Sequence, residues 1–264
     1  MKIIKASGNK ETFSSKKIYY SILESGASKS LARKITNKVK SSIKENSTTE
    51  QIYKLILREL KKQPGTAEKY NLKRAIMDLG PAGYAFEKYF SEILNYYGYK
   101  TKIGIHIKGK RIMHEVDILA VNEKKFMIEC KYHNENGIHT RLQPALAAYA
   151  RFLDLERHKI DQPWLVTNTR CTNDATNYAK GVNLKITGWK YPKGESLNNL
   201  IENKKLYPIT VLFLEEATKQ ALLTKGITLL KTLIEKTEQE LFKLTKIPIK
   251  EITRLKENAK TILN

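Results

Sequence analysis

Residues 112–132, IMHEVDILAVNEKKFMIECKY, decide the fold of the middle of the chain. On both sides of the polar segment 122–124, apolar residues alternate with polar ones. This period of two is typical of half-buried strands, and a short polar segment between two such runs indicates a hairpin turn. The stretch therefore predicts two antiparallel strands joined by a tight turn.

The register of this hairpin predicts a cluster of charges. If the turn is centred near Glu123, residues whose numbers sum to 246 lie opposite one another. Residues two apart on a strand project from the same face of the sheet. One face of the hairpin is then expected to carry Glu115, Asp117, Glu129 and Lys131.

Buried carboxylates repel each other and lose hydration, so such a cluster needs a compensating partner. Mg²⁺ is typically held by one or two carboxylates together with waters and substrate phosphates. Asp117 and Glu129 fit this role, with the carbonyl of Cys130 as a third ligand and Lys131 beside the reacting water or phosphate. The indicated chemistry is metal-assisted phosphodiester hydrolysis. The alternative is an exposed hairpin with ordinary cross-strand ion pairs.

The order of these residues resembles the PD-(D/E)xK nuclease superfamily, most closely its Mrr-like and Holliday-resolvase-like branches. The resemblance covers about residues 81–192, with Val116 where a proline is usual. It extends to a glutamate in GPAGYAFEKYF and a glutamine in RLQPALAAY. The resemblance implies a DNA endonuclease dependent on Mg²⁺ or Mn²⁺, in which Asp117 and Glu129 bind the metal. Glu115 would tune Lys131 or bind a second metal ion. The implied catalytic set is Glu87, Glu115, Asp117, Glu129, Lys131 and Gln143.

The flanking segments predict an α/β sandwich with a mixed sheet. A helix over 84–97 and a strand over 99–107 precede the hairpin; a helix over 141–157, a buried strand at 164–167, a helix to 180 and a strand over 182–187 follow it. The helix over 141–157 is expected to bury Leu142, Leu146, Tyr149, Phe152 and Leu153. Parity places His114 on the sheet face opposite Asp117, in a structural or DNA-binding role. His133 and His139 lie in the loop beyond Lys131 and could approach the scissile phosphate.

Composition points to a polyanionic partner. The 264 residues carry a formal net charge of +21, distributed along the whole chain, and such a surplus favours binding to nucleic acid. The two cysteines have no zinc-type spacing, and neither a signal peptide nor a membrane span is evident. We therefore expect a cytoplasmic protein that does not bind membranes.

The N-terminal segment IIKASGNKETFSSKKI predicts a β-hairpin followed by helices, and it resembles the ATP-cone, a regulatory nucleotide-binding module. The resemblance implies a site for ATP or dATP in which Lys5 and Lys17 contact phosphates and Thr49 lies by the base. The family's usual Lys-Arg-Asp-Gly reads Lys-Ala-Ser-Gly here, so one phosphate-binding arginine is missing. The alternative is a small basic domain whose lysines bind DNA or solvent. The nucleotide-binding set is Lys5, Gly8, Glu11, Lys17, Ile18 and Thr49.

Residues beyond about 215 predict helices only. They resemble a degenerate helix-hairpin-helix pair, in which the turn Lys225-Gly226-Ile227 would offer backbone N–H groups to DNA phosphate. The alternative is a packing or dimerisation module, and dimerisation would make the protein a homodimer.

Together these patterns predict a multi-domain α+β protein: an ATP-cone-like α/β domain (1–79), a restriction-endonuclease-like α/β sandwich (81–200) and an all-helical domain (201–264). The predicted function is a Mg²⁺-dependent DNA endonuclease of restriction or DNA repair, regulated by ATP or dATP. The alternative is a non-catalytic, nucleotide-responsive DNA-binding regulator. The sequence leaves open whether the DNA is methylated, branched or damaged.

Overall fold

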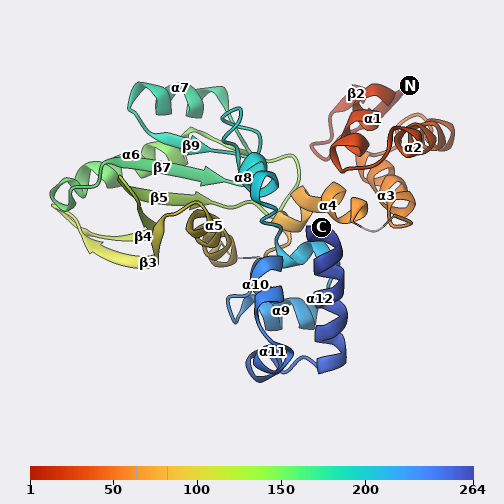
Figure 1. Cartoon of the computed structure of the whole chain (residues 1–264). Coiled ribbons are helices and arrows are strands. Elements are labelled where there is room, and N and C mark those ends of the chain that lie inside the picture. Colours follow the sequence, from red (N-terminus) through yellow and green to blue (C-terminus); the bar gives the residue numbers. More distant parts are fainter. Residues whose placement is uncertain (64, 82) are drawn as a thin grey trace.

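The computed structural model describes residues 1–63, 65–81 and 83–264, which form three bodies that meet around helix α4 (Thr66–Met77) (Figure 1). The N-terminal hairpin and helices lie on one side of α4, and the sheet lies on the other. The C-terminal helices lie below both in this view. Among the described residues, no helix combines the length and apolar character that crossing a bilayer requires.

The N-terminal body is a two-stranded hairpin followed by a helical bundle. Its elements are β1 (Lys2–Ile4), β2 (Lys10–Thr12), α1 (Ser15–Glu24), α2 (Lys29–Ser42), α3 (Thr49–Leu60) and α4. The Ser14 side chain caps α1, and Thr48 and Gln51 form a capping box at the start of α3. These caps satisfy backbone N–H groups that the first helical turn leaves unpaired. The buried core of this body lies within residues 22–67.

The central body is a five-stranded mixed sheet, as the sequence predicted. Its strand order is β3-β4-β5-β7-β9, with β3, β4 and β5 antiparallel and β5, β7 and β9 parallel. The strands are β3 (Lys100–Lys108), β4 (Met113–Val121), β5 (Lys125–Lys131), β7 (Gln162–Thr167) and β9 (Lys185–Thr187). Two short strands, β6 (His139–Thr140) and β8 (Arg170–Cys171), form a separate parallel pair.

Helices cover both faces of the sheet. The aromatic face of α5 (Tyr84–Tyr96) packs on Ile118, Ile128 and Trp164, while α6 (Leu142–Asp154) packs on the opposite face at Leu165. The remaining helical elements are η1 (Glu156–His158), α7 (Asn173–Gly181) and α8 (Leu197–Lys204).

The buried face of α6 differs from the prediction. Leu146 is 41% exposed and Leu153 is 54% exposed, whereas Ala145 and Ala148 are fully buried. Because alanine side chains are small, α6 can lie close to the strands. The large leucines therefore point to solvent, and the helix ends at Asp154.

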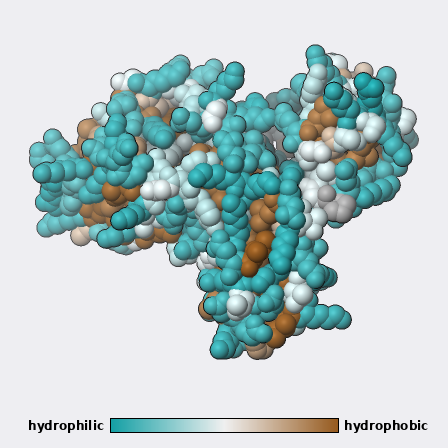
Figure 2. Space-filling view, in the orientation of Figure 1, coloured by the Kyte–Doolittle hydropathy of each residue, from teal (hydrophilic) through white to brown (hydrophobic). Residues whose placement is uncertain are grey.

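The C-terminal body is helical, as predicted, and shares its core with the central body. Its elements are η2 (Ile209–Leu212), α9 (Glu216–Leu223), α10 (Leu230–Glu235), α11 (Glu238–Thr245) and α12 (Ile249–Leu263). Their buried residues form one continuous hydrophobic cluster with α5 and the sheet. The buried hydroxyl of Tyr89 on α5 also donates to the carbonyl of Leu206 at 2.8 Å. Figure 2 shows a mostly hydrophilic surface, with apolar side chains exposed on the C-terminal helices.

The turn at Lys225-Gly226-Ile227 does not offer free N–H groups. Each of the three donates to a carbonyl of the preceding helical turn, that of Leu222 or Leu223. A backbone N–H that is already paired cannot bind a DNA phosphate. This expectation of the helix-hairpin-helix resemblance is therefore not met.

Candidate functional site

The hairpin register is the predicted one, and it opens into a fork. Residues pair from Val121↔Lys125 to Ile118↔Ile128, all summing to 246. Beyond Ile128, β5 continues along β7 while its pairing with β4 ends. At this point the side chain of Asp117 accepts the backbone N–H of Cys130 at 2.7 Å. Asp117 therefore lies in the opening between the two strands, where its carboxylate is held from the backbone of β5.

Glu87 reaches this opening from the first turn of α5. Burial, together with the neighbouring carboxylates of Asp117, Glu115 and Glu129, raises the pKa of its carboxyl to about 7. Like charges influence each other in this way only when they are close. The structure thus brings together all four acidic residues of the predicted set, although Glu115 itself is exposed.

Glu129 has a partner that the sequence did not reveal. Arg151 of α6 donates to its carboxylate and forms an ion pair with it. The pKa values of Asp117 and Glu129 are nevertheless raised, in both cases mainly by burial. The single guanidinium therefore does not balance the negative charge of the fork. Arg151 follows the buried Ala148 by three residues, so the helical period places it beside the sheet-facing side. This is the signal that the misread apolar face obscured.

The other predicted residues lie at the edges of the fork. Lys131 is exposed at the end of β5, and its charge lowers the pKa of Glu129 against the effect of burial. Gln143 lies in the first turn of α6 with its side chain exposed. Within the described residues, no hydrogen bond joins Gln143 to the acidic cluster. The Cys130 thiol is buried, and that burial raises its pKa far above the ordinary range.

The donor set fits a divalent cation. Two half-buried carboxylates with raised pKa values, Asp117 and Glu129, stand beside each other, and Mg²⁺ needs only one or two protein carboxylates. In residues 1–63, 65–81 and 83–264, no group of three or more His, Cys, Asp or Glu side chains is arranged so that it could hold a metal ion. A cation at Asp117 and Glu129 would therefore need water or substrate phosphate as further ligands.

Two of the three histidines considered have structural partners. His114 lies 2.9 Å from Asp154 at the end of α6, so it faces the helix that also carries Arg151. His133 contacts Thr140 at 3.1 Å, and its backbone N–H donates to Asn168. His114 therefore has a structural partner, which agrees with one of the two roles expected of it. Gly104, with φ of +58°, lies opposite Asp117 in β3 and interrupts the regular alternation.

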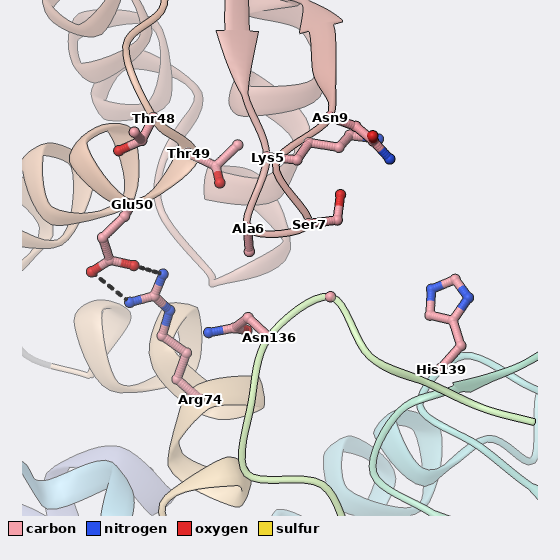
Figure 3. Close-up of a pocket in the computed structure, with 11 residues that line it drawn as sticks. Lys5, Ala6, Ser7, Asn9, Thr48, Thr49, Glu50, Arg74, Asn136 and His139 are labelled. Carbon is pink, nitrogen blue, oxygen red and sulfur yellow. Dashed lines mark hydrogen bonds and ion pairs between the residues drawn. The ribbon is translucent and has the colours of Figure 1, made fainter.

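The N-terminal body contains the second predicted site. A cavity of about 300 Å³ is lined by four of the six predicted residues, Glu11, Lys17, Ile18 and Thr49. The aromatic rings of Tyr53 and Tyr70 stack in its wall at 5.6 Å. Lys5 and Thr49 line a second cavity of about 710 Å³ (Figure 3). Gly8 lines neither cavity and supplies the positive φ of +80° at the hairpin turn.

The charges around these cavities are paired. Glu11 forms ion pairs with both Lys5 and Lys17. The hydrogen bond from Lys17, and to a smaller extent that from Lys5, lowers the pKa of its carboxyl to about 2. Arg74 of α4 is not in the predicted nucleotide-binding set. Its guanidinium lies 3.4 Å from the centre of the Tyr53 ring and donates to both oxygens of Glu50. An arginine thus stands beside the site although the hairpin turn lacks one.

Comparisons with known proteins cover the chain in three segments. Family models match an ATP cone domain at residues 1–78, a restriction endonuclease domain at 81–200 and an AF1548-like C-terminal domain at 207–263. Both main resemblances seen in the sequence are thereby confirmed.

Two relatives match across these segments. An uncharacterized protein of Archaeoglobus fulgidus is 37% identical over 152 residues, which are 57% of this chain and 87% of that protein. The crystal structure of AF1548, a protein of unknown function, has a TM-score of 0.63 and 33% identity, covering 69% of this chain and 98% of its own. The chain therefore belongs to the AF1548-like family, and it carries an ATP cone domain ahead of its restriction endonuclease domain.

Proposed function

We propose that this protein is a DNA endonuclease that depends on Mg²⁺ or Mn²⁺ and responds to ATP or dATP. The observation that carries the proposal is the fork between β4 and β5. There, half-buried carboxylates with raised pKa values surround an opening in the restriction endonuclease domain. The exposed side chain of Lys131 lies beside them.

Each residue has a distinct role in this proposal. Asp117 and Glu129 hold the metal ion, with the Cys130 carbonyl beside them. The bound ion supplies Lewis-acid activation of the phosphate and lowers the pKa of the attacking water. Lys131 positions that water and stabilises negative charge on the phosphate. Glu87, whose pKa is raised to about 7, accepts a proton near neutral pH.

Arg151 and Gln143 act from α6. The Arg151 guanidinium now neutralises Glu129, and a cation on the carboxylates would take over that task. The freed guanidinium can then form a bidentate pair with a phosphate. Gln143 is exposed at the start of α6, at the opposite end of the helix from Arg151. It is proposed to contact the substrate rather than the metal.

DNA is the proposed substrate because the chain carries a net charge of +21. Lysine and arginine side chains bind nucleic acid by displacing counterions from phosphates. We place the activity in restriction or DNA repair, and we propose that the enzyme cuts within a DNA strand rather than from its ends.

The test is cleavage of supercoiled plasmid and of branched DNA with Mg²⁺, with Mn²⁺ and with EDTA. Asp117→Asn and Glu129→Gln should lose activity on the order of 10²-fold or more, because each removes a ligand of an ion that contributes several kcal/mol. Glu123→Gln, at the exposed hairpin turn, is the matched control and should cut at the wild-type rate. Metal-independent cleavage, or full activity of Asp117→Asn, would refute the assigned site.

The second candidate is a non-catalytic, nucleotide-responsive DNA-binding regulator. The Glu129–Arg151 ion pair favours it, because this pair stabilises the fork without a metal. A regulator of this kind would bind DNA with the same affinity with Mg²⁺ and with EDTA, and it would leave every substrate intact. Cleavage in the plasmid assay decides between the two.

A further inference from the structure

The larger of the two N-terminal cavities is shared between domains. Its walls include Lys5, Thr49 and Arg74 of the ATP cone domain, and also Asn136 and His139 of the restriction endonuclease domain. Figure 3 shows the loop that carries Asn136 passing beneath the hairpin turn, with Asn136 reaching toward Arg74. At about 710 Å³, the cavity has the size of a small-molecule site.

The loop and the hairpin turn are in close contact. Gly137 has φ of +87°, and a Cβ added there would lie 3.4 Å from the backbone nitrogen of Ser7. Ala6 is the next neighbour, at 3.8 Å. The approach is therefore backbone against backbone, which ties the position of this loop to the shape of the ATP cone hairpin.

The same loop connects the two edges of the candidate active site. Residues 132–141 lead from Lys131 at the end of β5 to Gln143 at the start of α6. Both ends of the loop are fixed. His133 exchanges two hydrogen bonds with the Asn168 side chain, and the buried Thr140 hydroxyl contacts Thr167 at 2.8 Å. A force on the tip of the loop is thus transmitted to segments adjoining Lys131 and Gln143.

The chemistry of the two cavities suits different parts of a nucleotide. The smaller one has stacked tyrosines and apolar side chains, which suit a flat base. The larger one is lined by the cations Lys5 and Arg74, by Glu50, which pairs with Arg74, and by the N-terminus of α3, which favours negative charge. Thr49 lines both cavities and joins them.

We propose that the polyphosphate of a nucleoside triphosphate lies in the larger cavity, with the loop at 136–139 as part of its binding site. The restriction endonuclease domain thereby completes the nucleotide site, and the bound nucleotide sets the position of the segment between Lys131 and Gln143. This proposal rests on the proposed function for its consequence in catalysis. Its binding claim stands apart from catalysis.

Calorimetric titration of the full chain with ATP, with ADP and with inorganic triphosphate tests the binding claim. Asn136→Ala should weaken ATP binding about tenfold, as expected for the loss of one hydrogen bond to a charged group. Asn136→Asp should weaken it further, because the new carboxylate repels the phosphates. Asn134→Ala and Asn134→Asp are matched controls: Asn134 is exposed in the same loop and does not line the cavity. Both positions are on the surface, so none of the four substitutions should prevent folding.

The outcomes separate cleanly. Weaker binding confined to the Asn136 variants supports the shared site. Equal ATP affinity of the Asn136 variants and the wild type would show that the ATP cone domain holds the nucleotide by itself, and would overturn the proposal. Absence of ATP binding by the wild type would overturn it as well.

Cleavage measured with and without ATP then tests the link to catalysis. ATP should change the rate of the wild type, and the Asn136→Asp variant, compared with its own rate without nucleotide, should lose this response. An unchanged ATP response in Asn136→Asp would overturn the link. A wild type that binds ATP through Asn136 but cuts no DNA would refute the proposed function and leave the shared site supported.

Discussion

The fork of the restriction endonuclease domain and the hairpin of the ATP cone domain treat the same functional group in opposite ways. In the fork, burial and neighbouring carboxylates raise the pKa of Glu87 to about 7. In the hairpin, Lys17 and Lys5 lower the pKa of Glu11 to about 2. The first region has more negative charge than it can balance, and the second has two cations gathered on one carboxylate.

This difference teaches which ligand each region can accept. A cation entering the fork relieves repulsion and restores charge to the carboxylates, so binding and ionisation support each other. A phosphate entering the hairpin must instead compete with Glu11 for Lys5 and Lys17. The fork is therefore ready for its ligand, whereas the hairpin has to exchange one anion for another.

The largest expected effect concerns Lys131 in the fork. Lys131→Ala should lower the cleavage rate about 10²-fold, the usual cost of losing one group that stabilises transition-state charge. Its DNA affinity, measured by fluorescence anisotropy in Ca²⁺, should change far less. Lys124→Ala in the hairpin turn is the control. Equal losses of rate and affinity in Lys131→Ala would make this lysine a simple phosphate contact.

The second effect tests the hairpin as an anion site. ATP at a hundredfold excess over its Kd should stabilise the full chain by about 2.7 kcal/mol if it binds only the folded state. Lys17→Ala should reduce this stabilisation in thermal unfolding, while Lys16→Ala on the exposed side of α1 should not. No stabilisation of the wild type by ATP or dATP would leave the ATP cone domain as a basic DNA-binding unit.

The third effect is a pH dependence of stability that comes from the fork. Because the pKa of Glu87 is higher in the folded chain than its ordinary value of 4.5, folding becomes less favourable as the pH rises from 4.5 through about 7. In EDTA, Glu87→Gln should therefore be more stable than the wild type at pH 8, by on the order of 1–3 kcal/mol. The difference should shrink at pH 5.

Urea unfolding at the two pH values measures this difference, with Glu123→Gln as the control. Added Mg²⁺ should stabilise the wild type more than the variant at pH 8. A Glu87→Gln chain that is less stable than the wild type at pH 8 would contradict the repulsion assigned to the fork.

The smallest effect is expected for Glu11. Its pKa is lowered to about 2, so its contribution to stability is complete above pH 4.5 and is lost only as the pH falls through about 2. Glu11→Gln should therefore change the free energy of unfolding little, since exposed ion pairs contribute little, and the change should be the same at pH 5 and pH 8. If the effect of Glu11→Gln on the free energy of unfolding differed between pH 5 and pH 8, the contrast with Glu87 would be lost.

The sequence predicted those parts of the molecule that depend on local pattern. Alternation around Glu123 gave the hairpin register, and capping residues such as Thr48 marked where helices begin. The carboxylates of the fork followed from that register, because side chains two apart share a face. Glu87 and Gln143 came only from the family resemblance, and their roles remain predictions, as do the domain boundaries at residues 79 and 200.

The parts that were missed depend on contacts between distant segments. Arg151 was overlooked because the leucines of α6 outweighed its buried alanines in the periodicity. Arg74 lines the larger N-terminal cavity from the last helix of the ATP cone domain, which no spacing rule connects to the hairpin. The contact between Gly137 and Ser7 joins two loops of separate domains. Tertiary packing alone determines such contacts.

The shared core of the central and C-terminal bodies has a consequence for the order of synthesis. The fully buried core of the ATP cone domain lies within residues 22–67, whereas the core around α5 includes Ile262 of α12. Domains of a growing chain fold as their residues become available, starting from the N-terminus. The ATP cone domain can therefore fold before the later segments are made, but α5, which carries Glu87, gains its full cover only after α12 has been made.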